Sequence, residues 1–179
     1  MMPPDEFRTS RLVLRKPTPS DAEALFRAYA TDPEVTRYLS WLPHQTIGDT
    51  RRYVASCLER WEAQEGRTYV IDAEGVGQTA VGALGLLPGA HGFTFGYVLA
   101  RPCWRRGYMT EALTAVVRWA AAEPAVWRVW GTCDVDNAAS ARVMEKAGLG
   151  FEAILRRWAV NPNLDPHRPR DFRVYALVK

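Results

Sequence analysis

The chain has 179 residues, of which 47% are hydrophobic and 24% are charged, a composition typical of a folded protein rather than a disordered or fibrous one. The length suits one domain over residues 1–179 with a sizeable core. The 23 basic and 20 acidic side chains leave a net charge of +3, too small to predict direct binding of nucleic acid. No segment has the roughly 18 consecutive apolar residues of a membrane span.

The three cysteines and one acidic pair bear on metal binding and location. Cys57, Cys103 and Cys133 are widely spaced and form no C-x-x-C pair, so neither a disulfide framework nor a zinc site is predicted. Asp134 and Asp136 resemble a metal pair, but we expect them to shape a turn. The first ten residues, MMPPDEFRTS, lack the apolar stretch of a signal peptide. We therefore expect a cytoplasmic protein that binds no metal.

The first third of the chain predicts one strand and two helices. Residues 11–16 alternate between apolar and basic side chains, as in a half-buried strand. A helix is expected next, with Ser20 as its N-cap and Glu23 completing a capping box, and the sequence TDPEV at 31–35 is expected to end it. Over 46–64, apolar side chains spaced by three and four follow a capping threonine, which predicts a second, amphipathic helix.

The middle of the chain has the spacing of strands. Three short strands are expected over 68–72, 79–87 and 93–100. Glycines stand in both connections and favour antiparallel hairpins. These glycines are Gly75, Gly77, Gly89 and Gly92.

The last part of the chain mixes helices and strands. The expected elements are a helix over 107–122, a strand over 126–135, a helix over 137–147, and strands over 151–160 and 172–178. The apolar stripe of the first helix is Met109, Ala112, Leu113, Val116, Val117 and Ala120. Gly148 is expected to end the second helix in the left-handed conformation, and 161–170 is expected to be a Pro-rich polar loop. The element order predicts an α/β (α+β) fold with a mixed sheet.

The most informative segment is the turn before the helix at 107–122. Trp104, Arg105, Arg106 and Gly107 fill this turn, and the helix itself is expected to begin at Tyr108. Backbone N–H groups at the start of a helix lack partners, and the helix dipole adds about half a positive charge there. With a glycine and two arginines beside them, such groups favour phosphate binding. The alternative interpretation is a solvated basic turn that only caps a core helix.

Two segments together point to a family. Residues 137–151, NAASARVMEKAGLGF, closely resemble the asparagine–serine helix of the GNAT superfamily of acetyltransferases. Residues 104–109, WRRGYM, resemble the pyrophosphate-binding turn of the same family, R/Q-x-x-G-x-G/A. The opening TSRLVLRKPTPSDAEALF and the closing DFRVYALVK look like the RimJ/RimL-type branch, so the resemblance covers residues 9–178.

The resemblance implies a fold and an activity. The fold is a mixed, mostly antiparallel sheet of about seven strands flanked by about four helices. Its fourth and fifth strands splay apart to hold the pantetheine arm of acetyl-CoA. The implied activity is transfer of the acetyl group from acetyl-CoA to a primary amine, of a protein N-terminus or a small molecule, by direct attack in a ternary complex. We expect a monomer or a homodimer.

The same resemblance assigns roles to residues. The backbone groups expected to pair with pantetheine are those of Tyr97, Val98 and Leu99. The groups expected to hold the pyrophosphate are the amides of Arg105, Arg106, Gly107, Tyr108 and Met109 and the hydroxyl of Thr110. Asn137 is expected to bond the pantetheine, and Ser140 to lie near the thioester sulfur. Arg142 and Lys146 are expected to approach the remote phosphate of the cofactor.

The proton-transfer residues depart from the family pattern. Thr94 stands where many RimJ/RimL-type members have a glutamate base, and a threonine cannot act as a base at neutral pH. Met144 stands where many relatives have a tyrosine acid, which leaves Ser140 as the candidate acid and the base unassigned. Arg105 replaces a frequent glycine, and Met109 replaces a small residue.

Histidines and tryptophans in loops are further candidates for the base and for the acceptor pocket. His44 and His167 can act as bases near neutral pH, although loop histidines are more often only solvated. The seven tryptophans are in general expected to pack in the core and on the sheet. Trp41 and Trp158 are the exceptions, because loops beside the splayed strands usually shape the acceptor pocket in the family.

Two other functions stay open at this point. A non-catalytic acyl-CoA-binding or sensor module would account for the replaced glutamate and tyrosine. An RNA- or ribosome-associated protein would use its arginines, and it predicts RNA binding that falls steeply with salt.

Overall fold

One mixed sheet is the framework of the protein. The computed structural model describes residues 2–73 and 79–179, so Gly75 and Gly77 of the first expected hairpin turn lie outside the described residues. The strands are β1 (Glu6–Arg8), β2 (Leu12–Arg15), β3 (Arg67–Ala73), β4 (Gly82–Gly89), β5 (Gly92–Leu99), β6 (Arg128–Asp134), β7 (Gly150–Asn161) and β8 (Asp165–Val178). The α-helices are α1 (Asp21–Leu25), α2 (Pro33–Thr36), α3 (Ile47–Glu62), α4 (Tyr108–Ala122) and α5 (Ala138–Lys146). A π-turn, η1 (Phe26–Ala30), continues α1, and a 3-10 turn, η2 (Arg101–Cys103), follows β5.

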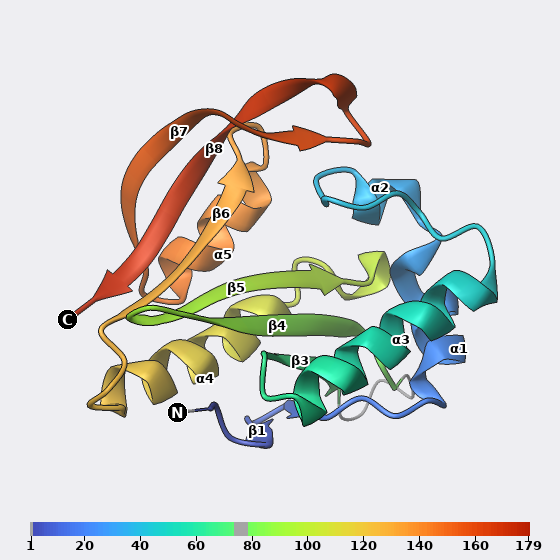
Figure 1. Ribbon diagram of the computed structural model, residues 1–179, viewed down its shortest axis with the longest axis horizontal. Coiled ribbons are helices and arrows are strands. Elements are labelled where there is room, and N and C mark those ends of the chain that lie inside the picture. The colour runs from blue at the N-terminus through green and yellow to red at the C-terminus, as the bar shows by residue number, and fades with distance from the viewer. Residues whose placement is uncertain (1, 74–78) are drawn as a thin grey trace.

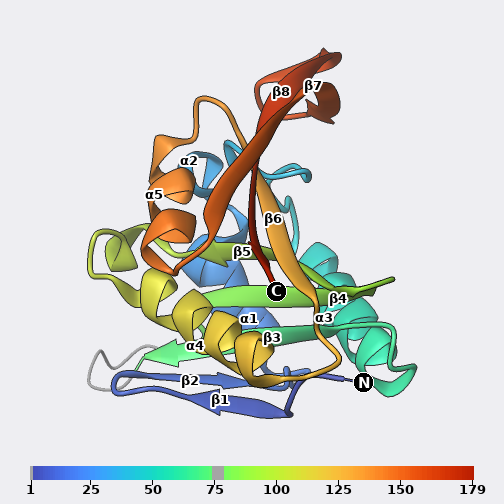
Figure 2. The ribbon, with the colours of Figure 1, turned by 90° about the vertical axis from the view of Figure 1, so that its left-hand side faces the viewer.

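The strands are ordered β1-β2-β3-β4-β5-β6-β8-β7. In the described part of the chain, β5 pairs with β6 in parallel and the other neighbours pair antiparallel. Helices α4 and α5 lie in front of the sheet in Figure 2, and α1 and α3 lie behind it. The expected mixed, mostly antiparallel sheet is therefore confirmed, with eight strands where about seven were predicted and five α-helices where about four were predicted.

The core lies between the sheet and α4. The apolar stripe predicted on this helix is buried at each of its six positions, with Ala112, Leu113, Val116 and Ala120 fully enclosed. Strands β2, β3 and β4 supply the facing side chains, which include Leu14, Ile71 and Leu84. This burial fixes the start of α4 against the end of β5, where the turn of interest lies.

The sheet opens between β5 and β6, as predicted for the fourth and fifth strands. The two strands pair only over Gly92–Thr94 and Arg128–Trp130, and Figure 1 shows them diverging beyond that point. The ring of Phe95 lies where a side chain on Gly131 would stand: a Cβ added there would lie 2.5 Å from the ring. A glycine at 131 therefore accommodates an aromatic wedge at the point where pairing ends.

The segment 31–35 ends the preceding helix as predicted, and its Asp32 then caps α2. Two other expectations about local structure are wrong. Ser20 makes no side-chain capping bond, and the carboxylate of Asp21 instead reaches back to accept hydrogen bonds from the Thr18 N–H (2.6 Å) and from Arg15 (2.8 Å). The expected loop 161–170 is mostly strand.

The last of these corrections has a structural cause. β8 begins at Asp165 and includes both Pro166 and Pro169. The pairing of β7 with β8 shifts register three times, and prolines are tolerated in strands at such irregularities. The turn between β7 and β8 is therefore only residues 162–164, and the hairpin is long (Figure 1).

The tryptophan prediction holds for only part of the set. Trp61 is buried as expected. Trp104 and Trp127 are instead 41% and 59% exposed, so these two do not pack in the core, and Trp158, one of the two expected exceptions, is 55% exposed. Trp158 lies on β7, the last strand of the sheet.

Candidate functional site

A row of unpaired backbone donors lies at the start of α4. The six N–H groups from Arg105 to Thr110 have no acceptor within the residues that the structure describes. The first hydrogen bond of the helix runs from the N–H of Glu111 to the carbonyl of Gly107, at 2.9 Å. Because α4 has 15 residues and its start is exposed, these donors form a site for a multiply charged anion.

The residues of this turn alternate between left-handed and right-handed backbone conformations. Arg105 has φ +61° and Gly107 has φ +79°, so both residues are in the left-handed region. Alternation of left- and right-handed residues directs successive N–H groups into one concave surface that binds anions. The conformation also explains why a glycine is frequent in the family at the position of Arg105, since glycine adopts a positive φ without strain.

Arg11, the residue just before β2, braces the turn through contacts with Arg106 and Glu111. Its Nε donates to Oε2 of Glu111 at 2.7 Å, and its Nη1 donates to the carbonyl oxygen of Arg106 at 3.0 Å. The guanidinium also lies over the ring of Tyr108, 4.7 Å from its centre. Glu111 accepts further bonds from the hydroxyls of Thr9 (2.6 Å) and Ser10 (3.1 Å). The segment before β2 is therefore tied to the first turn of α4.

If the turn holds the pyrophosphate of coenzyme A, as the resemblance implies, replacing Arg11 by alanine should weaken coenzyme A binding about fivefold, with little change in the rest of the fold. Arg11 is about half exposed, so its loss should cost roughly 1 kcal/mol of turn order rather than the full value of a buried ion pair. Isothermal titration with coenzyme A measures the effect. Arg8→Ala is the matched control, because Arg8 pairs only with Glu6 in the described structure. Equal affinities for the two variants would contradict a bracing role.

The outer half of β5 forms one wall of the gap between β5 and β6. Val98 and Leu99 pair with Ala83 and Gly82 of β4 on one side. On the other side, residues 95–99 have no strand partner in the described chain. Because the N–H of Ala100 bonds the carbonyl of Val81, the alternation of an antiparallel pair directs the backbone of Val98 toward Ala83 of β4 and that of Tyr97 and Leu99 toward the gap, where an extended ligand can pair with it. Trp104 marks the end of this wall by donating from Nε1 to the carbonyl of Leu99, at 2.7 Å.

The start of α5 forms the opposite wall. Asn137 caps this helix, its Oδ1 accepting a 3.1 Å hydrogen bond from the N–H of Ser140, and its amide nitrogen donates no bond within residues 2–73 and 79–179. The Oγ of Ser140 lies 2.8 Å from the hydroxyl of Tyr97. Burial raises the pKa of Tyr97, so its hydroxyl stays protonated. The side chain of Tyr97 therefore spans the gap and meets Ser140, a contact that sequence reasoning missed.

Arg170 holds the turn before α5. It donates to both carboxylate oxygens of Asp134, at 2.5 and 3.0 Å, and to Asp136 at 2.6 Å. Burial alone would raise the pKa of Asp134, but Arg170 and the backbone of Asp136 hold that pKa below its ordinary value. The expected turn-shaping role of the two aspartates matches this geometry, and Arg170 is the partner that the sequence did not reveal.

The remaining predicted residues lie around these walls. The side chains of Tyr108 and Met109 are buried, so only their backbone faces the turn, and Thr110, the third residue of α4, is half-buried. Arg142 and Lys146 are exposed on α5. The structure thus brings the turn, the outer half of β5 and the start of α5 to one gap.

A segment before α3 crosses the open end of the gap. We call residues 32–46 the bridging segment. Asp32 pairs with Arg101 just after β5, at 3.2 Å, and the Tyr38 hydroxyl lies 3.5 Å from the carbonyl of Asp136 just before α5. These contacts join the two walls of the gap.

The β7–β8 turn also holds the bridging segment. The amide nitrogen of Asn163 lies within 2.9–3.1 Å of three carbonyl oxygens of this segment, those of Thr36, Leu39 and Trp41. The amide nitrogen of Asn161, which is buried, donates to the carbonyl of Arg37 at 3.2 Å. The sequence predicts these two asparagines only as part of a polar loop, and no local pattern distinguishes them from its other polar residues.

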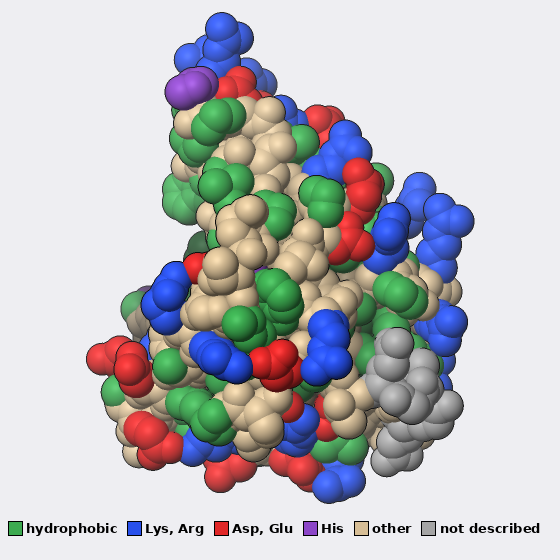
Figure 3. All heavy atoms as spheres, turned by 90° about the vertical axis from the view of Figure 1, so that its right-hand side faces the viewer, with side chains coloured by type: hydrophobic (Ala, Val, Ile, Leu, Met, Phe, Trp, Pro, Cys, Tyr) green, Lys and Arg blue, Asp and Glu red, His purple; other side chains and the backbone are tan. Residues whose placement is uncertain are grey.

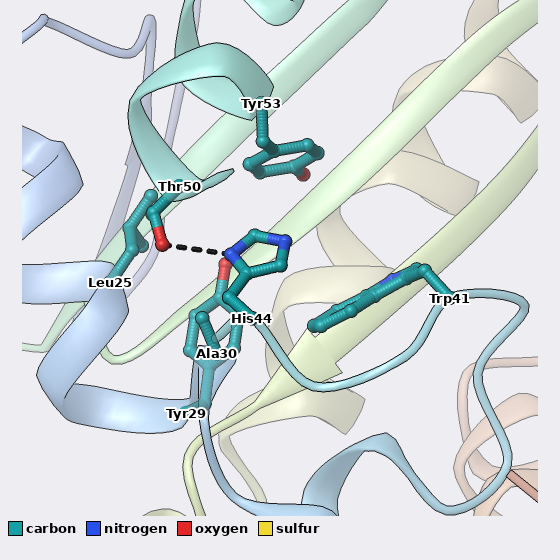
Figure 4. Close-up of a pocket in the computed structure, with 7 residues that line it drawn as sticks. All are labelled: Leu25, Tyr29, Ala30, Trp41, His44, Thr50 and Tyr53. Atoms are coloured by element: carbon teal, nitrogen blue, oxygen red, sulfur yellow. Dashed lines mark hydrogen bonds between the residues drawn. The ribbon is translucent and has the colours of Figure 1, made fainter. Parts of the chain in front are cut away.

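A pocket lies beneath the bridging segment. It is lined by Leu25, Tyr29, Ala30, Trp41, His44, Thr50 and Tyr53, has a volume of about 160 Å³, and is called the aromatic pocket below. Figure 4 shows the rings of Trp41, His44 and Tyr53 around it. Nδ1 of His44 lies 2.8 Å from the Thr50 hydroxyl, and burial lowers the pKa of this histidine, so it is neutral at pH 7. His167, the other histidine considered as a base, is exposed on β8.

The metal-ligating side chains and the helices of the described residues bear on metal and membrane binding. Within the described residues, no group of three or more His, Cys, Asp and Glu side chains is arranged to hold a metal ion. The helices of this part of the chain are also too short or too polar to span a bilayer.

Comparisons with known proteins agree with this geometry. A family model described as "Acetyltransferase (GNAT) domain" matches residues 11–150. The uncharacterized N-acetyltransferase YoaA of Bacillus subtilis (strain 168) is 28% identical over 176 residues, which cover 97% of this chain and 96% of that protein. The crystal structure of a GNAT-family acetyltransferase from Bacillus anthracis is similar with a TM-score of 0.82 at 26% identity, covering 97% and 98% of the two chains.

A further solved structure is similar in fold. It is RimL, named as the ribosomal L7/L12 alpha-N-protein acetyltransferase, in complex with coenzyme A. The TM-score is 0.81 at 20% identity, and the match covers 95% of each chain.

Proposed function

The chain belongs to the GNAT family of acetyl-CoA-dependent acetyltransferases, and from this premise we propose that it acetylates a primary amine held beside acetyl-CoA in the gap between β5 and β6. The family is the one that the motifs at 104–109 and 137–151 indicated. The observation that supports this site most strongly is the row of six unpaired N–H groups from Arg105 to Thr110 at the end of that gap.

Acetyl-CoA fits the residues along the gap by chemistry. Its pyrophosphate would accept hydrogen bonds from the N–H groups of the turn and from the Thr110 hydroxyl. Its pantetheine amides would pair with the free edge of β5 at Tyr97 and Leu99, on either side of Val98, and with the amide nitrogen of Asn137. Arg142 and Lys146, exposed on α5, offer positive charge to the remote phosphate.

The transfer step needs an oxyanion donor, a base and an acid. The neutral amine attacks the thioester carbonyl. Of the two candidate donors, Val98 and Leu99, the N–H of Leu99 faces the gap and would stabilise the charge that develops on the carbonyl oxygen. The C–S bond then breaks and the thiolate accepts a proton, for which Ser140 is the nearest candidate donor. His44 is better suited than His167 to accept the proton from the amine, because it is neutral and lies under the bridging segment.

The proposed acceptor is a primary amine of any source. The likeness to RimL is one of fold and does not narrow this class. A protein N-terminus and a small-molecule amine both supply a primary amine. An RNA-binding function has less support: on the face shown in Figure 3, basic side chains are interspersed with acidic ones over most of the surface.

Incubation of the protein with acetyl-CoA and a panel of amines and short peptides tests the function. We expect free coenzyme A thiol to appear only when both acetyl-CoA and an acceptor are present, and the acetylated acceptor to be detected by mass spectrometry. Hydrolysis without acceptor is the blank. Tight binding of coenzyme A without transfer to any acceptor would instead indicate the non-catalytic acyl-CoA-binding module, and no binding at all would refute the site.

A further inference from the structure

The aromatic pocket contains a buried hydroxyl that lacks a partner. Tyr29, one of the lining residues, is 2% exposed, and its hydroxyl has no hydrogen-bond partner in the described residues. Leaving a buried hydroxyl unpaired costs about 1–3 kcal/mol, so such groups are usually bonded to protein, water or ligand. Burial also raises the pKa of Tyr29, so this hydroxyl remains a donor as well as an acceptor. It can bond a polar atom that enters the pocket.

The rest of the pocket selects against charge. Trp41, His44 and Tyr53 present aromatic rings, and none of the residues that line the pocket carries a formal charge at neutral pH. A charged group buried here would lose its hydration without gaining an ionic partner. The volume of about 160 Å³ is close to that of cavities known to accept a benzene ring. An uncharged ring or branched apolar group is therefore the occupant that fits.

One segment both lines the pocket and contacts the two walls of the gap. Trp41 and His44 belong to the bridging segment, whose carbonyls are held by Asn163 and whose Asp32 is paired with Arg101 at the end of β5. A molecule with its ring in the pocket can therefore present its other end toward the gap. Such a molecule has an apolar half and a reactive half.

We propose that the aromatic pocket binds the side group of the acceptor amine, and that this group is an uncharged, phenol-like ring whose hydroxyl bonds with Tyr29. This inference rests on the proposed function, since it names the acceptor of that site. The shared chemistry is a phenol-like group attached to a primary amine, which occurs both in small arylalkylamines and in a peptide that begins with tyrosine.

Steady-state transfer to paired acceptors tests the specificity. The small pair is tyramine against 2-phenylethylamine, and the peptide pair begins with tyrosine or phenylalanine. For at least one pair we expect kcat/KM to favour the hydroxyl about tenfold in the natural protein. Tyr29→Phe should bring that ratio close to one, while coenzyme A affinity stays within about threefold. The pair that shows the effect identifies the source of the acceptor.

Tyr69→Phe is the matched control. Tyr69 is also buried, but its hydroxyl donates a hydrogen bond to the carbonyl of Pro4, which is not among the residues that line the pocket. The ratio should be unchanged in this variant. Since Tyr29→Phe removes an unpaired hydroxyl and keeps the ring, we expect it to fold with an equal or higher melting temperature. Trp41→Leu is the second variant and should weaken both members of a pair alike.

A binding experiment separates this proposal from the proposed function. Titration with 4-methylphenol, which has no amine to acetylate, should show binding that Tyr29→Phe weakens about tenfold, while toluene binds both proteins equally. If 4-methylphenol binds in this way but no amine is acetylated, the pocket stands and the proposed function fails. If amines are acetylated but neither the ratio nor 4-methylphenol binding depends on Tyr29, water satisfies the hydroxyl and the pocket proposal is overturned.

Discussion

Gly107→Val should raise the dissociation constant of coenzyme A at least 100-fold, which corresponds to about 2.7 kcal/mol. Gly107 is the N-cap of α4 at φ +79°, a conformation that strains a β-branched residue by about 1–2 kcal/mol. A Cβ at this position would lie 3.4 Å from Nη2 of Arg11. The rest of a valine side chain must therefore displace the brace or cover the N–H groups of the turn. Calorimetric titration with coenzyme A measures the loss.

Gly148→Val is the control that distinguishes a specific loss of coenzyme A affinity from the effect of backbone strain alone. Gly148 also has a left-handed φ, +94°, as predicted for the residue that ends α5, and a Cβ there meets nothing within 4 Å. Both variants should lose a similar 1–2 kcal/mol of unfolding free energy, measured by urea denaturation. The Gly148 variant should bind coenzyme A within about threefold of the natural protein. A comparable loss of affinity in both variants would attribute the effect to general destabilisation and refute the phosphate turn.

The elements that sequence reasoning placed correctly are those whose pattern is local. The stripe of α4 and the cap at Gly148 each depend on residues within one helix. β1, by contrast, has only three residues, too few for a periodic pattern, and it exists because it pairs with β2. β8 was missed over its first residues because Pro166 and Pro169 favour a loop when partners are unknown.

The candidate site divides in the same way. The turn at 105–107 and the start of α5 are each formed by consecutive residues, so a short sequence motif can indicate each of them. Arg11 reaches the carbonyl of Arg106 across 95 positions of the chain, and Asn163 reaches Trp41 across 122. A single sequence contains no signal for such pairs, because nothing near Arg11 or Asn163 specifies a partner so far away. Only the tertiary fold identifies them as parts of the site.

Ser140→Ala should lower kcat about 100-fold while coenzyme A affinity changes less than threefold. A positioned acid contributes about 10²–10⁴ to a rate, and Ser140 is the hydroxyl on α5 that faces Tyr97 across the gap. The control is Ser20→Ala, because the Ser20 hydroxyl makes an equally long 2.8 Å contact, with Thr18, outside the site. That variant should retain the natural kcat. Steady-state assays with the best acceptor of the panel measure both.

Tyr97→Phe and the double variant decide whether the two hydroxyls act as a unit. If Tyr97 orients the Ser140 hydroxyl, its loss should lower kcat about tenfold, and the double variant should be little worse than Ser140→Ala alone. Additive losses would indicate two independent roles, because residues that act through one another are not additive. An unchanged kcat in Ser140→Ala would remove Ser140 from the mechanism. The buried Tyr97 hydroxyl, which also contacts the Ser140 carbonyl at 3.2 Å, would then be the candidate proton donor.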